Sequence, residues 1–417
     1  MSHEMPPMNE LLQFMPTVQY GDAKPTLNNE PSTLPTDAIG GALHLSSVLP
    51  ALSDAIGTPV ATAVHKNLAQ LREALGIPTA KHALVVLVDG MGYWNLLDRI
   101  GHAPYLRSLL KDDANARPIG TCAPSTTVAA MGVFGTGTCP GLTGMAGYTQ
   151  INPETGELSQ LIQFRNALKP EVLQQQPTVF ELLKAHGANA TSVGLAKFAR
   201  SPLTQATLRG SKYVKADRPS SMVERTVQAL QEPGLVYLYL RDVDKIGHAA
   251  GWTGDGWGEA LERIDNILGS ISRMAPKDTV ICIVADHGMV NANPDQRIDV
   301  AQEPTLMHGV KLIGGEPRSL MLYVEDGEDP EAVATRWRSR LGDHALVRTL
   351  DQATEQGLYG PISEHVHPML GQVSVCVNDE MTLVNSLTQS EVAMSLPSVH
   401  GSQTRMEMQI PCLIDAQ

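Results

Sequence analysis

Acidic and histidine side chains gather at four places along the sequence, and their types are those of metal ligands. Three of these places follow short apolar runs that read as strands, and the fourth is a loop in the last part of the sequence. Carboxylate oxygens and imidazole nitrogens are the ligands that zinc and similar divalent ions accept. Three carboxylates and three imidazoles can hold two ions if a hydroxyl group and substrate oxygens complete the coordination. The candidate ligands are Asp89, Asp244, His248, Asp286, His287 and His400.

The spacing of the candidates limits how they can reach one ion. Asp244 and His248 are four residues apart, so one helical turn or one loop can present both. Asp286 and His287 are adjacent, so both can face one site only on a bent backbone, which Gly288 would permit. Each motif alone is also an ordinary turn sequence. The prediction of a metal site therefore depends on their joint occurrence at strand ends.

A candidate nucleophile lies in the segment that begins at Pro124 and continues through Ser125, Thr126 and Thr127. A helix is predicted to start at the threonines. A hydroxyl group there faces free backbone N–H groups and the positive end of the helix dipole, which favour an anion. The alternative is that Ser or Thr only caps the helix. Threonine is a weak nucleophile unless a metal or a base lowers the pKa of its hydroxyl, and the predicted metal cluster meets that condition.

Apolar runs that alternate with helical segments must position these residues. This alternation predicts the α/β class, with a mostly parallel central sheet and helices on both faces. The carboxyl ends of parallel strands share one edge of the sheet, so ligands far apart in the sequence can converge there. Helices are predicted over residues 42–57, 60–76, 178–188, 221–232 and 257–275, and strands over residues 82–88, 189–196, 235–244 and 279–288.

The domain organisation predicted from the sequence is one large domain with an N-terminal arm. Residues 1–40 are rich in Pro, Asn and Thr and show no sustained period, so they are expected to be irregular. Residues 41–417 form the predicted catalytic domain. A β-α-β-β pattern at about 316–385 predicts a small α+β subdomain that is inserted into this domain or appended to it.

Composition limits the partners and the compartment. The formal net charge of −13 disfavours nucleic-acid polymers and anionic membranes, which need a basic surface. A small anion is still compatible, because buried cations can reverse the local field. The five cysteines are an odd number, and the sequence shows neither a leader pattern nor a long apolar run. These features predict a cytoplasmic protein with reduced thiols. Nothing in the sequence indicates the oligomeric state.

The motifs resemble those of the alkaline phosphatase superfamily, most closely its nucleotide pyrophosphatase/phosphodiesterase branch. The resemblance runs from about residue 80 to residue 403 and lies in their order and spacing: residues 86–92, 124–148, 242–248, 284–289 and 399–404. It implies an alkaline-phosphatase-like fold and two zinc ions, with other divalent metals as an alternative. One ion would be held by Asp89, Thr127, Asp286 and His287. The other would be held by Asp244, His248 and His400.

The resemblance also implies the reaction. Thr127, three residues after Pro124, would be the nucleophile that attacks phosphorus in a small phosphate ester, such as a nucleotide. The ester would be hydrolysed through a covalent phospho-threonine intermediate. The sequence has no obvious counterpart of the arginine with which phosphomonoesterases clamp phosphate, which favours diesters. Ala130 stands where that branch is expected to have an asparagine that binds a phosphoryl oxygen.

Other residues and functions stay open. Tyr93, Tyr148 and Phe164 are candidates for lining a substrate pocket, Met145 is expected to be packing, and Asp242 has no matched role. A phosphomonoesterase or phosphonate hydrolase would use the same two-metal site. A metal-stabilised binding protein without catalysis is the alternative outside enzymes.

Overall fold

A mostly parallel six-stranded sheet lies at the centre of the computed structural model, which describes residues 5–21 and 41–417. Its order is β18-β8-β1-β7-β5-β6, and the five strands from β8 to β6 are parallel. Strand β18 pairs with β8 in the antiparallel direction and forms one edge. The bounds are β1 His82–Val88, β5 Asn189–Gly194, β6 Lys212–Lys215, β7 Gly234–Leu240, β8 Thr279–Val284 and β18 Cys412–Ala416.

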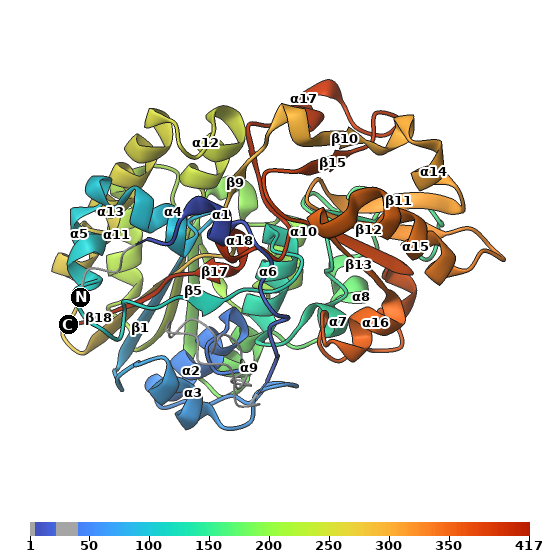
Figure 1. Cartoon of the computed structure of the whole chain (residues 1–417). Coiled ribbons are helices and arrows are strands. Elements are labelled where there is room, and N and C mark those ends of the chain that lie inside the picture. The colour runs from blue at the N-terminus through green and yellow to red at the C-terminus, as the bar shows by residue number, and fades with distance from the viewer. Residues whose placement is uncertain (1–4, 22–40) are drawn as a thin grey trace.

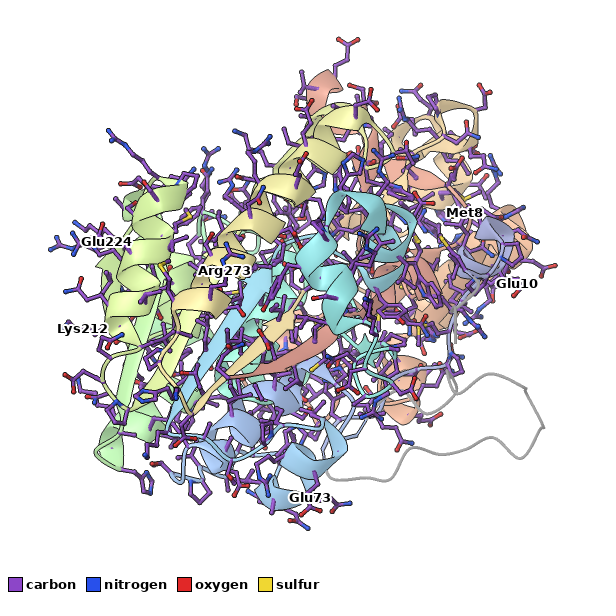
Figure 2. All side chains as sticks on the ribbon, turned by 90° about the vertical axis from the view of Figure 1, so that its left-hand side faces the viewer. Met8, Glu10, Glu73, Lys212, Glu224 and Arg273 are labelled. Atoms are coloured by element: carbon purple, nitrogen blue, oxygen red, sulfur yellow. The ribbon has the colours of Figure 1, made fainter. Side chains whose placement is uncertain are left out.

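The central strands are apolar on both faces because helices cover both. Every residue of β1 and β8 is buried, as expected for parallel strands between two helical layers. One layer contains α2 (Leu45–Ala55), α6 (Thr127–Thr136) and α9 (Val179–Ala185), which contact one another. The other contains α5 (Pro104–Leu109), α11 (Pro219–Ala229) and α13 (Asp255–Met274) (Figure 1). The view in Figure 2 has α11 and α13, marked by Glu224 and Arg273, side by side in front of the sheet.

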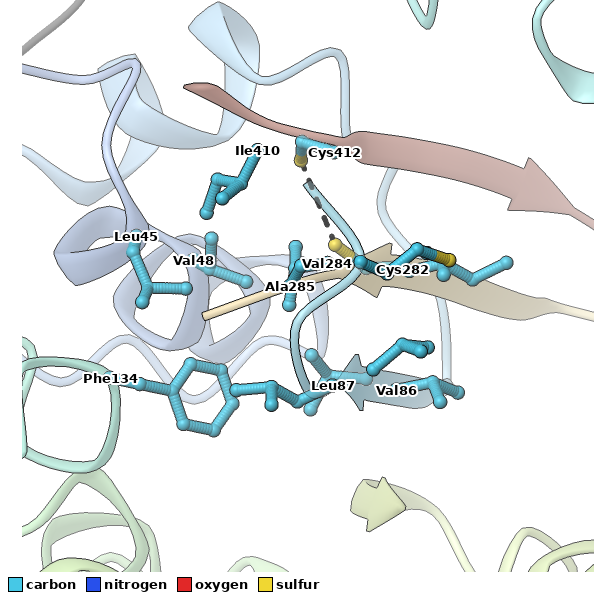
Figure 3. Packing of buried hydrophobic residues seen from close by; sticks show 14 of the residues in the cluster. Leu45, Val48, Val86, Leu87, Phe134, Cys282, Val284, Ala285, Ile410 and Cys412 are labelled. Carbon is cyan, nitrogen blue, oxygen red and sulfur yellow. Dashed lines mark hydrogen bonds between the residues drawn. The ribbon is translucent and has the colours of Figure 1, made fainter. Parts of the chain in front are cut away.

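The core between the sheet and the first helical layer is closely packed. Phe134 of α6 lies over Leu87 of β1, and Val48 of α2 lies near by (Figure 3). On the other side of this view, the sulfur atoms of Cys282 and Cys412 approach to 3.9 Å without a disulfide. The chain's five cysteines all fall within the described residues and are free and buried.

Three predicted element boundaries are wrong, and one of them is the strand predicted over residues 279–288, which ends at Val284. The helix predicted over residues 60–76 is only α3 (Leu68–Ala74), because the side chain of Asn67 accepts from the N–H of Gln70 and caps the helix there. The strand predicted over residues 235–244 ends at Leu240, and its acidic end is the first turn of α12 (Asp242–Ala250).

A second sheet, called the small sheet here, lies beside the central one (Figure 1). Its four antiparallel strands have the order β11-β12-β14-β13. Helix α15 (Pro330–Leu341) packs on it through the buried Trp337. The predicted β-α-β-β pattern corresponds to β12, α15, β13 and β14, whereas the first strand was missed. The bounds are β11 Val310–Glu316, β12 Ser319–Val324, β13 Ala345–Thr349 and β14 Val373–Val377.

Short elements join the two sheets. Three antiparallel pairs are β2 (Ile119–Gly120) with β17 (Gln409–Ile410), β3 (Thr149–Ile151) with β4 (Leu158–Gln160), and β9 (Val290–Asn291) with β16 (Ser398–Val399). Strands β10 (Arg297–Asp299) and β15 (Thr382–Val384) pair in parallel. The remaining helices named below are α4 (Tyr93–Asp98), α10 (Pro202–Thr207), α17 (Glu391–Met394) and α18 (Arg405–Met408).

Part of the predicted N-terminal arm is ordered against the body. Residues 5–21 contain the short helix α1 (Met8–Leu11), and Leu11 is buried. The N–H of Met15 donates to the carbonyl of Gln403 at 2.9 Å. The other residues of the predicted arm lie outside the described ones, and the division into arm, catalytic domain and subdomain stays a prediction. In the described part of the chain, every helix is too short or too polar to cross a membrane.

Candidate metal centre

The six predicted ligands converge at the carboxyl edge of the central sheet. Asp89 follows β1, Asp286 and His287 follow β8, and helix α12, which begins directly after β7, carries Asp244 and His248. His400 follows β16, whose pairing with β9 brings the last part of the chain to this edge. Parallel register aligns Val88 with Leu240 in β7, so the strands end side by side.

One group of side chains surrounds the hydroxyl of Thr127. Its Oγ1 lies 3.3 Å from Asp89 Oδ1 and 3.2 Å from His287 Nε2. His287 Nε2 lies 3.6 Å from Asp89 Oδ1 and 3.5 Å from Asp286 Oδ2. These four residues are the set that the resemblance implied for one ion.

The second implied set gathers around Asp244. Its Oδ1 lies 3.3 Å from His248 Nε2 and 4.0 Å from His400 Nε2. Asp244 and His248 share one face of α12, as their spacing predicted.

His287 stands between the two sets. Its ring stacks on that of His400, with centroids 3.6 Å apart and planes at 18°. By ligand-atom distances, Asp89, Asp286 and His287 form one candidate metal group, and Asp244, His287 and His400 form another. Distance alone therefore places His287 in both groups, and the division of ligands between two ions stays a proposal.

Hydrogen bonds orient all three imidazoles in the same way. The Nδ1 atoms of His248, His287 and His400 lie 2.8, 3.1 and 2.9 Å from the backbone carbonyls of Ser398, Gly288 and Ser125, respectively. A carbonyl only accepts, so Nδ1 carries the proton and each Nε2 keeps a free lone pair toward the carboxylates. Metal-binding histidines commonly donate their other ring N–H to a carbonyl or carboxylate in this way.

Two carboxylate oxygens indicate that the site fits cations. Asp244 Oδ1 and Asp286 Oδ2 are buried and accept no hydrogen bond from the described residues. The other oxygen of Asp286 accepts from the N–H groups of Gly90 and His287 at 2.9 and 3.0 Å. A buried, unpartnered carboxylate oxygen is unfavourable unless a cation contacts it.

The pKa shifts reflect this crowding. Burial, with the nearby Asp89, raises the pKa of Asp244 to about 7, and burial raises the pKa of Asp286 to about 7. Burial and the charge of Asp286 raise the pKa of Asp89 well above its usual value. Burial and the neighbouring imidazoles lower the pKa of His400. The protein alone thus disfavours three carboxylate charges here, whereas a divalent cation would favour them.

The side chain of Thr127 does not cap helix α6. Thr127 is the first residue of α6, and neither it nor the N-cap residue Thr126 makes a side-chain capping bond to the helix. Its hydroxyl instead faces Asp89 and His287.

Gly288 serves close packing rather than a left-handed bend. A Cβ atom there would lie 2.0 Å from the carbonyl oxygen of Met406 in α18. Its N–H donates to the carbonyl of Glu407 at 2.9 Å. The missing side chain lets the Asp286–His287 turn lie directly against the C-terminal segment.

Two cavities meet at this centre and share Thr126, Tyr148, His248 and His400 among their lining residues. The first, called the basic cavity, has a volume of about 690 Å³ and is also lined by Asp89, Thr127, Lys197, Phe198, Tyr239 and Arg241. The second, called the small-sheet cavity, has a volume of about 990 Å³ and is also lined by Gln160, Ile313, Glu316, Leu320, Asn385 and Ala393.

Among the other candidates, only Tyr148 reaches the cavities. Tyr93 is 1% exposed and packs edge-on against Trp94, so its assignment to a substrate pocket is wrong. Phe164 and Met145, of which Met145 was expected to be packing, belong to a hydrophobic cluster and line neither cavity. Asp242 is exposed on the surface.

Ala130, the position where an asparagine was expected, lines neither cavity. Ala130 is fully buried in the main hydrophobic core.

Several functional candidates were missed. Tyr239 donates to Asp89 Oδ2, and Lys197 and Arg241 both lie near the ring of Phe198 in the basic cavity. Desolvation, with the charges of Arg241 and Lys245, lowers the pKa of Lys197. Lys197 and Arg241 follow β5 and β7, so the rule that found the acids could have found them too.

Known proteins resemble this chain in sequence pattern and in fold. The pattern described as type I phosphodiesterase / nucleotide pyrophosphatase matches residues 83–390. None of the curated proteins matches the sequence. Phosphonoacetate hydrolase from Sinorhizobium meliloti 1021, solved with phosphonoformate, is similar in structure with a TM-score of 0.64 at 20% identity; the match covers 81% of this chain and 91% of that one.

Murine ectonucleotide pyrophosphatase/phosphodiesterase 5 is similar with a TM-score of 0.63 at 14% identity, over 81% of this chain and 88% of its own. An inactive form of that protein, solved with AMP, is similar with a TM-score of 0.62 at 14% identity, and the coverage of both chains is the same. At these identities the similarity shows the fold, and it confirms the predicted alkaline-phosphatase-like α/β architecture. Because the family pattern covers most of the sequence, the chain belongs to the type I phosphodiesterase / nucleotide pyrophosphatase family of phosphoric ester hydrolases.

Proposed function

We propose that the protein is a two-metal phosphodiesterase that acts on small phosphate esters, with Thr127 as the nucleophile and zinc as the metal. The observation that carries the proposal is the position of the Thr127 hydroxyl, which contacts Asp89 and His287 at the start of α6. In this proposal Asp89, Thr127, Asp286 and His287 hold one ion, and Asp244, His248 and His400 hold the other. When bound, the two ions would neutralise phosphoryl charge and lower the pKa of the Thr127 hydroxyl.

The chain's own residues support the other parts of the reaction. Asp89 Oδ1 and His287 Nε2 flank the Thr127 hydroxyl and would hold the ion beside it, so the proton that the hydroxyl loses passes to solvent water. The deprotonated oxygen attacks phosphorus, the ester bond opposite to it breaks, and a phospho-threonine forms. Water then hydrolyses this intermediate and restores Thr127. The free N–H groups at the start of α6 stabilise the phosphoryl oxygens.

A second candidate, phosphonate hydrolysis, is favoured by the basic cavity. Lys197 and Arg241 place two cationic side chains beside the centre, which suits a substrate with a second anionic group. A nucleotide diester and a phosphonate that carries a carboxylate both meet this requirement. We further infer a reducing, cytoplasmic location, which the unpaired cysteines support.

The test is a hydrolysis screen of metal-loaded protein on phosphate monoesters, diesters, pyrophosphates and phosphonocarboxylates. We expect diesters to be hydrolysed fastest, and Thr127→Ala to lower kcat by on the order of 10³-fold or more while circular dichroism stays unchanged. Thr127→Ser keeps a hydroxyl group and should retain part of the activity. Full activity in Thr127→Ala would exclude the nucleophile, and no turnover of any substrate with metal bound would favour a binding protein.

A further inference from the structure

The metal centre lies at the junction of two cavities of different chemical character. Both cavities reach His248 and His400, whereas only the basic cavity reaches Thr127 and Asp89. A phosphodiester has two substituents on phosphorus. Each cavity can therefore receive one substituent. The direction from which Thr127 attacks decides which substituent lies in which cavity.

Displacement at phosphorus places the nucleophile and the departing oxygen roughly in line, on opposite sides of the phosphorus atom. The Thr127 hydroxyl lies in the basic cavity. The small-sheet cavity approaches the centre from the side of His248 and His400 and does not include Thr127 among its lining residues. The departing oxygen thus points toward the small-sheet cavity, and the retained group stays in the basic cavity.

The lining of the small-sheet cavity indicates what it can hold. Its floor is apolar, with Ile313, Leu320 and Leu383 all less than a tenth exposed. Amide side chains, including Asn385 and Gln389, supply hydrogen-bonding groups. Apart from histidines, its ionisable lining residues among those described are Arg165, which is exposed, and Glu316, which is buried.

This lining contrasts with that of the basic cavity. There the cationic Lys197 and Arg241 lie beside the centre. A volume of about 990 Å³ is at the large end of the usual range for small-molecule sites. The small-sheet cavity therefore suits a neutral group with at least one ring.

We infer that the small-sheet cavity is the leaving-group site, and that it binds the uncharged, ring-sized alcohol released from the diester. This inference rests on the proposed function. In the step, the Thr127 oxygen forms a bond to phosphorus and gives up its proton, while the bond from phosphorus to the ester oxygen breaks. The electron pair leaves with that oxygen, which takes up a proton and becomes the free alcohol.

The test varies the two arms of the diester separately. Aryl diesters with a 4-nitrophenyl or a bulkier 4-nitro-1-naphthyl leaving group are compared, each with a methyl or a phenyl retained group. Rates are normalised to uncatalysed hydrolysis of the same ester. The variant Ala393→Trp fills the small-sheet cavity from α17, where Ala393 is half-buried. Gln389→Trp is a second filling variant if the first does not fold.

We expect Ala393→Trp to lower kcat/KM for the naphthyl esters at least about tenfold more than for the nitrophenyl esters, whichever group is retained. The matched control is Ala332→Trp, a half-buried alanine of α15 outside both cavities, which should keep the wild-type ratio. The inference would be overturned if the ratio of kcat/KM for naphthyl to nitrophenyl esters were unchanged in both filling variants. It would also be overturned if the change in this ratio depended on the retained group.

A binding measurement separates this inference from the proposed function. Titration of metal-loaded protein with 4-nitro-1-naphthol and inorganic phosphate requires no turnover. If no ester is hydrolysed but Ala393→Trp weakens naphthol binding, the cavity site stands and the proposed function fails. If the esters are hydrolysed but naphthol binding and the rate ratio are the same in the variants, the cavity assignment fails alone.

Discussion

At the scale of single residues, the candidate centre depends on where polar atoms are left free. The three imidazoles point Nε2 at the carboxylates because backbone carbonyls occupy their Nδ1 atoms. Residue types and spacing were enough to predict every ligand candidate that the structure brings together. The backbone partners of these side chains come from distant segments, so local sequence contains no signal for them.

Glu316 shows the limit of prediction at this scale. It ends β11 of the small sheet, and its Oε2 accepts from the N–H of Tyr148 at 3.0 Å. Its Cγ packs so closely on Gly401 that a Cβ there would lie 2.5 Å away. No pattern in the sequence links residue 316 to His400. Tyr93 was predicted to line a substrate pocket but is buried. The sequence could not decide between the two, because an aromatic residue after a strand is as compatible with the core as with a pocket.

Glu316 predicts a pH-dependent stability. Burial raises the pKa of Glu316 from its ordinary value of 4.5 to about 8, so between these pH values the folded chain holds a proton that the unfolded chain releases. Its contribution to the free energy of unfolding is therefore present at low pH and is lost as pH rises toward about 8. We expect Glu316→Gln to flatten the fall in stability of the metal-free protein between about pH 5 and pH 8. Urea unfolding at several pH values measures this, and an equally steep fall in the variant would contradict it.

At the scale of elements, the turn between β11 and β12 holds the C-terminal segment against the centre. Arg318 is fully buried and pairs with Glu407 of α18 through two hydrogen bonds, of 2.8 and 2.9 Å. Glu407 also accepts from the N–H of Ser402, two residues after His400. The small sheet thereby fixes the loop that carries the last metal ligand.

Removing Arg318 should therefore destabilise the protein strongly. We expect Arg318→Met to lower the free energy of unfolding by about 3–5 kcal/mol, because it leaves the buried carboxylate of Glu407 without its partner. Arg340 forms a comparable pair with Glu303 at the surface, at 2.6 Å. Arg340→Met should lower stability much less, because solvent screens this exposed pair. Denaturant unfolding of both variants is the measurement, and equal effects would show that burial of the pair is unimportant.

The Gly288 turn predicts a second effect at this scale. Gly288→Ala would place a Cβ atom 2.0 Å from the Met406 carbonyl, so the Asp286–His287 turn and α18 must separate. We expect lower stability together with weaker metal binding, measured by chelator competition. Gly101→Ala is the matched control, because a Cβ there meets nothing within 4 Å. Wild-type metal affinity in Gly288→Ala would show that this contact does not position the ligands.

At the scale of the whole molecule, the net charge of −13 and a site for anions are compatible. Two divalent cations would contribute four positive charges against three ligand carboxylates, and Lys197 and Arg241 add two more beside them. The pocket can be electropositive while the outer surface is acidic. The alternation of strands and helices predicted the central sheet correctly, whereas the order of its strands depends on long-range pairing that local patterns do not contain.

Removal of the metal tests whether bound cations offset the charge of the three ligand carboxylates. A chelator should lower the Tm of the wild-type protein, and zinc should restore it, because ligands that bind only the folded state stabilise it by about 2.7 kcal/mol at a hundredfold excess over Kd. The variant Asp286→Asn should show a smaller shift between the two conditions. Identical Tm values with chelator and with zinc would indicate that these residues do not hold a metal.

The position of His400 has a further consequence for the energetics of the chain. Asp244 and His248 precede the small sheet, and His400 follows it. An ion bound between them would connect two segments that are separated in the sequence by the entire small sheet. Because the ion binds only the folded state, separation of these ligands would release it, so the free energy of metal binding would oppose unfolding of the whole segment. The metal would then stabilise the fold of the whole segment in addition to its role at the reacting phosphorus.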